Sequence, residues 1–478
     1  MPEPSIDPMR PQLTRRRHMP TAALSPGAQQ PSPETSIPGH LCESCLDAPA
    51  VHLQPAPWGG EMGVCQGDRI ILKRLRPPVA LPLLCFSLQT PCGGAYRMSI
   101  PVNASIVKHF QSLEDPRIER TKKHTLLDIL VIALCTLLSG GEGFKDMELF
   151  GKSQHAWLQT FLALPHGIPS HDTFGRVFAH LNPQRFQACF LSWTQAVAQL
   201  TQGALVSLDG KTVKAAFDRA TAAPPLPMVS AWCSENGGLG VGQVKTESKS
   251  NESTAIPELL HLLAIKGCIV TIDAMGCQTA IARQIRDQGG DYLLALKGNH
   301  KKASTTIKKY FHQHIEHQLA WRTAKNFLDA FDDSHGRTVR RRVWTITDLV
   351  ALPELTKWPD LQAVIVVETI RAAHPGAPIT SDYRVYISSV IRSAPVFVAM
   401  IRQPWDIENK LHWSLDVTFN EDRCRIRKAH APENMTAARH IALNLLRQEH
   451  SRKMSLRQKR LLCGLDEQDL LTVLSGAT

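Results

Sequence analysis

The chain has 478 residues, of which 43% are hydrophobic and 20% are charged, and its formal net charge is +11. A chain of this length can bury more than one core, so we expect more than one domain. No apolar run reaches the roughly 18 residues that a membrane span needs, and the first ten residues lack the hydrophobic stretch of a signal peptide. We therefore expect a cytoplasmic protein with no membrane partner.

Residues 1–97 differ in composition from the rest of the chain. They contain 16 of the 32 prolines and show no sustained hydrophobic periodicity. Such a segment has too little apolar surface to offset the entropy of ordering it. We expect a disordered extension, or a mis-started reading frame whose natural start is Met98.

Residues 104–200 show a helical pattern. Apolar side chains nearly encircle Leu126–Leu138 when it is drawn as a helix, which predicts the central helix of a small bundle. Further on, Ser170 precedes a segment with basic and hydroxyl side chains, residues 171–178. This pattern suits the second helix of a helix-turn-helix, and an ordinary capped helix would show it too. We expect a small helical DNA-binding domain here.

From residue 203 onward, strand patterns alternate with helical ones. The order is three strands, a helix, a strand, a helix and a strand, which is the order of an RNase H-like mixed sheet. The expected strands are 204–209, 228–233, 240–244, 268–273 and 292–296, and the expected helices are 256–265, opened by Pro257, and 278–288.

Three more strands, at 341–346, 362–369 and 383–390, predict a β-rich insertion over about residues 300–402. Helical segments follow, and residues 451–478 read as a basic tail. The predicted fold class is α/β: an RNase H-like catalytic domain over residues 203–450 with a β-rich insertion. A small helical domain and a disordered extension precede it.

Two of the predicted strands end on an acid, Asp209 and Asp273. The first and fourth strands of an RNase H-like sheet are neighbours, so the two carboxylates would lie side by side and repel each other unless a proton or cation lies between them. Mg²⁺ or Mn²⁺ meets that need, and a third acid would complete a site for two ions about 4 Å apart. Taken singly, each aspartate could instead cap a helix or form a turn.

A later helix offers the third acid. Glu408 lies well inside it and, by α-helical spacing, shares a face with His412 and Leu415. Glu421 and Asp422, near the end of that helix, are the alternatives. Geometry favours Glu408.

Basic residues follow the same helix. Between Arg423 and Arg460 there are eleven Lys or Arg residues and two acids, a net charge of +9. Such a segment favours a polyanion, most often nucleic acid, although a solvated helix face would look the same. The candidate DNA-binding residues are Arg423, Arg425, Arg427 and Lys428, with Lys211 and Lys297 near strand ends. The aromatic residues Trp405, Trp413 and Phe419 are expected in the core, with stacking on a flipped base as the alternative.

Several segments carry a family resemblance, among them SLDGKTVKAAFDR, TIDAMGCQTAIARQIRDQGGDYLLALKGNH and IENKLHWSLDVTFNEDRCRIRK. From about Ala104 to Gln448 the chain resembles the H-repeat-associated insertion-sequence transposases of the RNase H-like DDE superfamily. The resemblance implies that Asp209, Asp273 and Glu408 are the catalytic acids and the ligands of two Mg²⁺ or Mn²⁺ ions.

The resemblance also implies a reaction. Water cuts DNA at the element's end, and the freed 3′-hydroxyl attacks target DNA, so the partners would be the terminal inverted repeats and target DNA. A homo-oligomer in the DNA complex is left open.

One position departs from the family pattern. Pro404 stands where the family usually has a His before Trp405, which brings the activity of this copy into question. Two alternatives therefore remain: an RNase H-like metal-dependent DNA nuclease without strand transfer, and a catalytically impaired DNA-binding remnant.

Overall fold

The computed structural model describes residues 104–198, 200, 202–213, 226–235, 237–246, 252–334, 337–372 and 379–476. The extension predicted over residues 1–97 lies outside the described residues, so the expectation for it stays a prediction. No helix in the described part of the chain is both long enough and apolar enough to cross a membrane.

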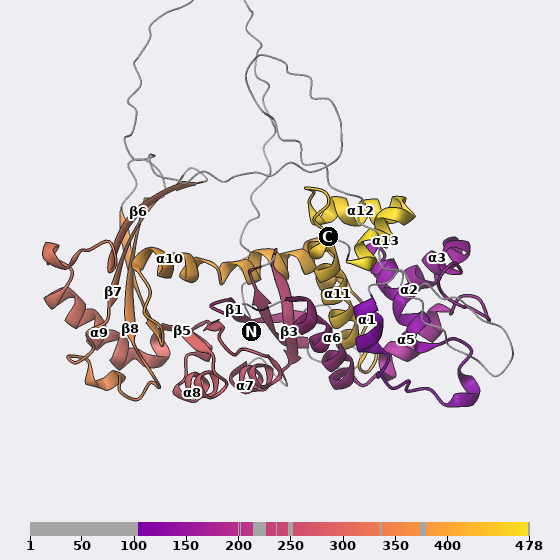
Figure 1. Ribbon diagram of the computed structural model, residues 1–478, viewed down its shortest axis with the longest axis horizontal. Helices are drawn as coiled ribbons and strands as arrows, with labels where there is room; N and C mark the ends of the chain where they lie inside the picture. The colour runs from indigo at the N-terminus through magenta and orange to yellow at the C-terminus, as the bar shows by residue number, and fades with distance from the viewer. Residues whose placement is uncertain are drawn as a thin grey trace, which may run out of the picture. The chain divides into compact units, whose positions relative to one another are not determined.

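Helices make up the amino-terminal part of the described chain, which is indigo to purple in Figure 1. They are α1 (Ala104–Phe110), α2 (Leu126–Leu138), α3 (Phe144–Ser153), α4 (His155–Leu158), α5 (His171–His180) and α6 (Pro183–Ala198). The predicted central helix, α2, is confirmed with the predicted bounds. The Thr125 side chain caps it by accepting a hydrogen bond from the backbone N–H of Asp128, and every residue from Asp128 onward is buried.

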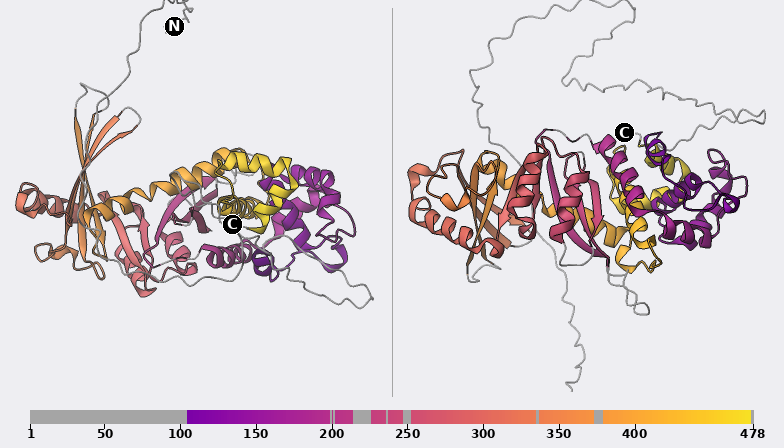
Figure 2. Two further views of the ribbon diagram at one scale, coloured as in Figure 1. Left: turned by 45° about the horizontal axis from the view of Figure 1, so that its top comes forward. Right: turned by 90° about the horizontal axis from the view of Figure 1, so that it is seen from below.

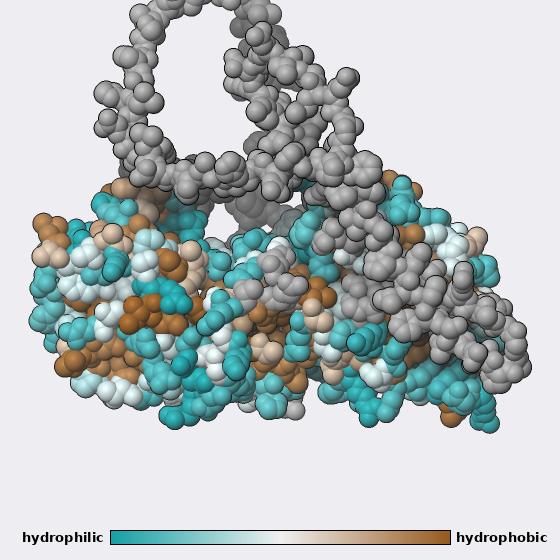
Figure 3. Space-filling view, in the orientation of Figure 1, coloured by the Kyte–Doolittle hydropathy of each residue, from teal (hydrophilic) through white to brown (hydrophobic). Residues whose placement is uncertain are grey.

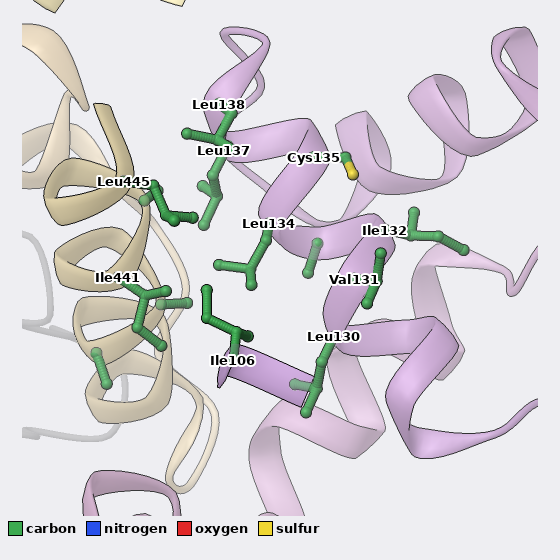
Figure 4. Packing of buried hydrophobic residues seen from close by; sticks show 14 of the residues in the cluster. Ile106, Leu130, Val131, Ile132, Leu134, Cys135, Leu137, Leu138, Ile441 and Leu445 are labelled. Atoms are coloured by element: carbon green, nitrogen blue, oxygen red, sulfur yellow. The ribbon is translucent and has the colours of Figure 1, made fainter. Parts of the chain in front are cut away.

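The same core takes in residues from the other end of the chain. Helix α11 (Ala431–Gln448) packs against α2, α5 and α6 and buries most of its length. In Figure 4 the side chain of Leu134 on α2 points toward Ile441 on α11, with Ile106 of α1 close by. The amino-terminal helices therefore share their core with a late helix and do not enclose one by themselves.

Residues 451–476 do not form the basic tail that their charge suggests. They form α12 (Leu456–Leu465) and α13 (Glu467–Ser475), which contact α2 and α11. Two of the basic residues in this stretch, Lys459 and Arg460, are buried and donate hydrogen bonds to backbone carbonyls of neighbouring segments. These two charged groups therefore link neighbouring helices, and a count of charges along the sequence cannot show this.

The described strands form one nine-stranded mixed sheet in the order β3-β2-β1-β4-β5-β9-β8-β7-β6. β1, β2 and β3 are antiparallel, and β4 and β5 run parallel to β1, so the predicted RNase H-like arrangement is confirmed. The strands are β1 (Leu205–Val213), β2 (Leu226–Cys233), β3 (Leu239–Lys245), β4 (Ile269–Ile272), β5 (Asp291–Leu296), β6 (Phe327–Ser334), β7 (Arg337–Ile346), β8 (Ala363–Ala372) and β9 (Thr380–Ser388).

The strands of the predicted insertion extend this sheet. β9 pairs antiparallel with β5, and β8, β7 and β6 follow outward (Figure 1). Strand β6 was not predicted, because its sequence FLDAFDDS carries three acids and no regular alternation.

Helices and apolar side chains cover both faces of the sheet. The helices are α7 (Glu252–Leu262), α8 (Thr279–Asp287), α9 (Lys301–His314) and α10 (Ala394–Arg402), followed by π-helical turns at Ile407–His412 and Ser414–Thr418. Successive strand residues point to opposite faces. Val206 and Leu208 of β1 join the cluster beneath α7, α8 and α9, whereas Leu205 joins the cluster beneath α10. Figure 2 shows α7 and α8, in rose, against the sheet, and Figure 3 shows hydrophilic residues around smaller hydrophobic areas on one surface.

Several predicted boundaries differ from the structure by a few residues, among them the end of β1 and the start of α7. Strand β1 does not end at Asp209, because its antiparallel pairing with β2 continues as far as Val213. Helix α7 begins at Glu252, so Pro257 lies inside the helix and not in its first turn.

Leu137→Ala tests the central position of α2. The side chain of Leu137 is fully buried, so the substitution leaves a cavity and should lower the free energy of unfolding by about 2–5 kcal/mol. Urea denaturation measures this. The matched control is Leu149→Ala in α3, where the leucine is 68% exposed and the change should stay within about 0.5 kcal/mol. Equal, small effects for both variants would contradict the packing.

Candidate active site

Asp209 and Asp273 follow the last residue pair of two neighbouring parallel strands. Leu208 of β1 pairs with Ile272 of β4, and each aspartate is the next residue along its strand. The two acids are therefore adjacent at one edge of the β1–β4 pairing, as the strand order predicts. Their side chains are 38% and 63% exposed, so both carboxylates reach solvent.

The Asp273 carboxylate has two hydrogen-bond donors. Its Oδ1 accepts from the backbone N–H of Ala274 at 2.6 Å and from Nζ of Lys297 at 2.8 Å. Partial burial opposes ionisation, but these two hydrogen bonds and the positive charges of Lys297 and Arg384 outweigh it. They hold the pKa of Asp273 below its ordinary value. Asp273 is thus ionised at neutral pH, and it caps the following turn while already holding a cationic partner.

Glu408 lies on the π-helical turn Ile407–His412, in which the N–H of Trp413 bonds to the carbonyl of Glu408, five residues earlier. The shared face predicted for Glu408, His412 and Leu415 is wrong, because α-helical spacing does not hold here. Glu408 is exposed, whereas the other two are buried. Short π-helical segments are frequent at functional sites.

His412 connects this turn to β1. The turn contacts β1 and β2, and Nδ1 of His412 lies 3.7 Å from Oδ2 of Asp209. Burial, with the nearby charges of Lys211 and His440, lowers the pKa of His412 to about 3, so its imidazole is neutral at neutral pH. The turn that carries Glu408 therefore lies beside Asp209. The Glu408 carboxylate itself forms no hydrogen bond or ion pair with another described residue.

Lys211, two residues after Asp209, points into the protein. Its Nζ donates to Oδ1 of Asp416 at 2.6 Å and to Oε2 of Glu421 at 2.7 Å. Burial would favour the neutral forms, but the opposite charges outweigh it. The pKa of Lys211 is raised, and that of Glu421, which also faces Arg439, is lowered. This buried ion pair ties β1 to the segment that follows Glu408.

The ion pair gives a structural role to two residues for which the sequence predicts a functional one. Lys211 was expected to contact DNA, but its side chain is 10% exposed and its ammonium is held by two carboxylates. Glu421 was an alternative third acid, but it is fully buried and faces two cations. Asp422, the other alternative, is partly buried. Among the three acids considered, Glu408 alone is exposed in the structure.

The basic run after this segment divides into two parts. Arg423, Arg425, Arg427 and Lys428 are exposed. Arg439, like Lys459 and Arg460 in the later helices, is buried. The first part therefore presents all of its charge on the surface, where a polyanion could reach it, whereas the later part buries some of its charge and exposes Arg452, Lys453 and Arg457.

Two tryptophans expected in the core lie on the surface. Trp405 is 59% exposed and Trp413 is 56% exposed, whereas Phe419 is buried as expected. The reason is the direction in which the π-helical segment packs: Ile407 and Leu411 face the helical core, which leaves the tryptophans outside.

Sequence reasoning missed residues of the β-rich insertion that lie near the acids. A hollow of about 460 Å³ beside the Glu408 turn is lined by Arg384, Tyr386 and Trp405, among others. The charge of Arg384 also acts on Asp273. No local pattern marks Arg384 and Tyr386, because only the pairing of β9 with β5 brings them to the site.

Pro404 lies in the turn between α10 and the Glu408 segment. Its carbonyl accepts a hydrogen bond from the N–H of Ile407 at 3.2 Å. Proline needs no N–H partner in such a first turn, so the backbone carrying Glu408 is formed despite the missing His.

The residues present suit a hard divalent cation by their chemistry. Within the described ranges no group of three or more His, Cys, Asp or Glu side chains is gathered closely enough to hold a metal ion. Asp209 and Asp273 nevertheless present oxygen ligands at adjacent, exposed positions, and Glu408 is exposed on the neighbouring turn. Oδ1 of Asp273 faces one cationic group in the structure, the Lys297 ammonium, at 2.8 Å.

The strand order and the adjacent acids place the chain in the class of RNase H-like proteins. Comparison with known families makes the assignment narrower. The family described as "Transposase DDE domain" matches residues 202–445, and the family described as "DDE_Tnp_1-associated" matches residues 107–194. The chain belongs to this family of DDE transposases.

Named relatives agree with the assignment. The chain is 36% identical over 376 residues to "H repeat-associated putative transposase YhhI" of Escherichia coli (strain K12), covering 78% of this chain and 98% of the relative. It is 37% identical over 365 residues to "Putative transposase YncI" of Escherichia coli O157:H7, covering 74% and 90%. The solved piggyBac transposase synaptic complex with hairpin DNA matches with a TM-score of 0.32 and 10% identity, covering 78% of this chain and 77% of that one.

Glu421→Gln tests the buried ion pair. The substitution leaves Lys211 and Arg439 buried without their full counter-charge, so the free energy of unfolding should fall by about 3–5 kcal/mol at neutral pH. Urea denaturation measures it. Glu408→Gln is the matched control, and since Glu408 is exposed the change should stay within about 0.5 kcal/mol.

The difference between wild type and Glu421→Gln should also depend on pH. The pKa of Glu421 is depressed on folding, so its stabilisation is present above the ordinary value of 4.5 and is lost as the pH falls through the lower folded pKa. A Gln variant as stable as wild type at pH 7 would show that Glu421 is not a structural counter-ion.

Proposed function

We propose that this protein is a DNA transposase that binds the ends of its element, hydrolyses a phosphodiester there and joins the freed 3′-hydroxyl to target DNA. One observation carries the proposal: the β1–β4 register sets Asp209 and Asp273 side by side in a chain that belongs to the DDE transposases. The partners are then the terminal inverted repeats and target DNA.

Asp209, Asp273 and Glu408 would hold two Mg²⁺ or Mn²⁺ ions. When bound, such ions supply an activated water and stabilise the leaving oxygen at a phosphodiester. The chain's own residues fix the ligands: β1 is paired on both sides up to Leu208, and the N–H of Ala274 orients the Asp273 carboxylate.

Neighbouring side chains set the charge of the site. His412 is buried and neutral, so it adds no positive charge that would compete for Asp209. Lys297 neutralises Asp273 from an exposed position, where it could also donate to a phosphate. The exposed Arg423, Arg425 and Lys428 would hold the DNA backbone.

Asp273→Asn tests the catalytic role. The amide can still accept from the N–H of Ala274 but loses the charge that a divalent cation requires. Cleavage and joining should fall on the order of 10³-fold, equivalent to about 4 kcal/mol, while DNA affinity stays within a few fold. A strand-transfer assay with labelled element ends and Mg²⁺ measures this.

Asp287→Asn, an exposed residue at the end of α8, is the matched control and should leave the rate unchanged. If Asp273→Asn kept wild-type activity, Asp273 would be only a turn residue. If it lost folding, which circular dichroism would reveal, its structural role would dominate.

The second candidate function is a DNA-binding remnant without catalysis, and Pro404 is the observation that favours it. The same assay separates the candidates. Joined products support the transposase, cleavage without joining supports a nuclease, and binding without cleavage supports the remnant.

A further inference from the structure

A groove of about 850 Å³ lies between the amino-terminal helices and residues 423–428. Lys145 of α3 and Arg176 of α5 line one side of it. The other side is the chain from Arg423 to Lys428, which follows the proposed catalytic segment. The groove therefore joins the part matched by the associated-domain family to the part matched by the transposase DDE family.

The second side owes its charge to an alternating sequence, Arg-Cys-Arg-Ile-Arg. The backbone at Cys424 is extended, so successive side chains point in opposite directions. Cys424 and Ile426 are partly buried, and Ile426 packs on the helical core, whereas the three arginines are exposed. On an extended chain such alternate residues lie about 6.6 Å apart. The segment thus presents its guanidinium groups to solvent while Cys424 and Ile426 face the protein.

The first side is anchored as well. Gly175 of α5 lies against Phe144 at the start of α3, and a Cβ there would lie 3.4 Å from that ring. The Phe144 ring also contacts Phe178, with centroids 5.6 Å apart. Asn434 of α11 donates hydrogen bonds to two backbone carbonyls of the α5 end, at 2.8 and 3.0 Å. Helix α5, which carries Arg176, is therefore fixed relative to α11, the helix that follows residues 423–428.

Positive charge around the groove exceeds negative charge. The lining contains six Lys or Arg residues and three acids, Glu142, Asp146 and Asp172. Two of the acids are engaged inside the protein: Glu142 accepts from the side chain of Asn420, and Asp146 accepts backbone N–H groups at the start of α3.

The cations, in contrast, are mostly unpaired. Lys145, Arg176, Arg423, Arg425 and Lys428 form no ion pair with other described residues, and all five are exposed. A fixed surface with this much uncompensated charge attracts a polyanion.

We propose that this groove binds the phosphate backbone of duplex DNA, so that the α3–α5 side and residues 423–428 grip one duplex together. Duplex DNA carries a phosphate about every 3.4 Å along each strand, so several exposed guanidinium groups within one short segment can reach neighbouring phosphates. The choice of DNA rests on the proposed function.

The groove is also connected to the proposed catalytic acids. The segment 423–428 starts two residues after Glu421, whose buried pair with Lys211 fixes this part of the chain to β1, the strand of Asp209. A duplex held in the groove is therefore positioned relative to Asp209 through a short and buried connection.

The salt dependence of binding tests the proposal. The probe is a fluorescein-labelled DNA duplex of random sequence, without divalent cations, and anisotropy gives its affinity across a salt series. Lys145→Gln with Arg176→Gln should reduce the slope of log affinity against log salt by about 1.8, since each lost phosphate contact removes about 0.9. Arg423→Gln with Arg425→Gln should do the same.

The matched control combines Arg283→Gln in α8 with Lys309→Gln in α9, both exposed and outside the groove lining, and its slope should equal that of wild type. An unchanged slope for Lys145→Gln with Arg176→Gln would contradict the proposal that both sides of the groove hold one duplex. Slopes that change with an RNA duplex but not with DNA would overturn the choice of partner.

A second measurement uses the unaltered protein. Bound duplex should protect Lys145 and Lys428 from acetylation, with loss of most of their reactivity, while Lys309 reacts as before. Equal reactivity of Lys145 and Lys428 with and without DNA would contradict DNA binding in the groove.

The outcome is distinguishable from that of the proposed chemistry. Asp273→Asn should keep the wild-type salt slope. If the groove variants change the salt slope but the wild-type protein joins no DNA, the groove binds DNA and the transposase reaction is contradicted. If the protein is active but the groove variants keep the wild-type salt slope, only the proposed groove is contradicted.

Discussion

The parallel pairing of β1 with β4 is the constraint on which the site depends. Because Leu208 and Ile272 form its last pair, Asp209 and Asp273 must lie next to each other whatever the rest of the chain does. A shift of one residue in this register would turn every side chain of one strand to the other face and separate the acids. The two apolar clusters on either side of the sheet prevent such a shift, because alternate β1 residues belong to different clusters.

A buried ion pair then fixes the second half of the site. Lys211 and Glu421 lie more than two hundred residues apart, and their contact holds the segment after Glu408 against β1. Taking charges out of water is costly, so such a pair adds little net stability compared with apolar packing. Its demanding geometry makes it suited to positioning, and it leads directly into the exposed arginines of the groove.

Much of the fold follows from local patterns. The apolar side chains encircling Leu126–Leu138 identify the central helix, and the order of strands and helices identifies the RNase H-like sheet. The neighbouring positions of Asp209 and Asp273 follow from that order alone. Other features depend on contacts between distant segments, and no local pattern contains them.

The π-helical turn of Glu408 is one such feature, since the sequence there reads equally well as an α-helix. The burial of Lys211 is another, because an isolated lysine after a strand gives no sign of carboxylates that arrive two hundred residues later. The approach of Arg384 requires β9 to pair with β5. In each case the missing information is a long-range contact. The same holds for residues 451–476, whose charge favours a basic tail although they form helices that pack on α2 and α11.

Iron-directed cleavage of the protein tests most directly whether the three acids share a divalent-cation site. Fe²⁺ in place of Mg²⁺, with ascorbate and hydrogen peroxide, generates radicals that cut the backbone near the bound ion. If the three acids share a site, cuts are expected near residues 209, 273 and 408 together, and excess Mg²⁺ should suppress them. Cuts near only one of these residues, or only elsewhere in the chain, would contradict it.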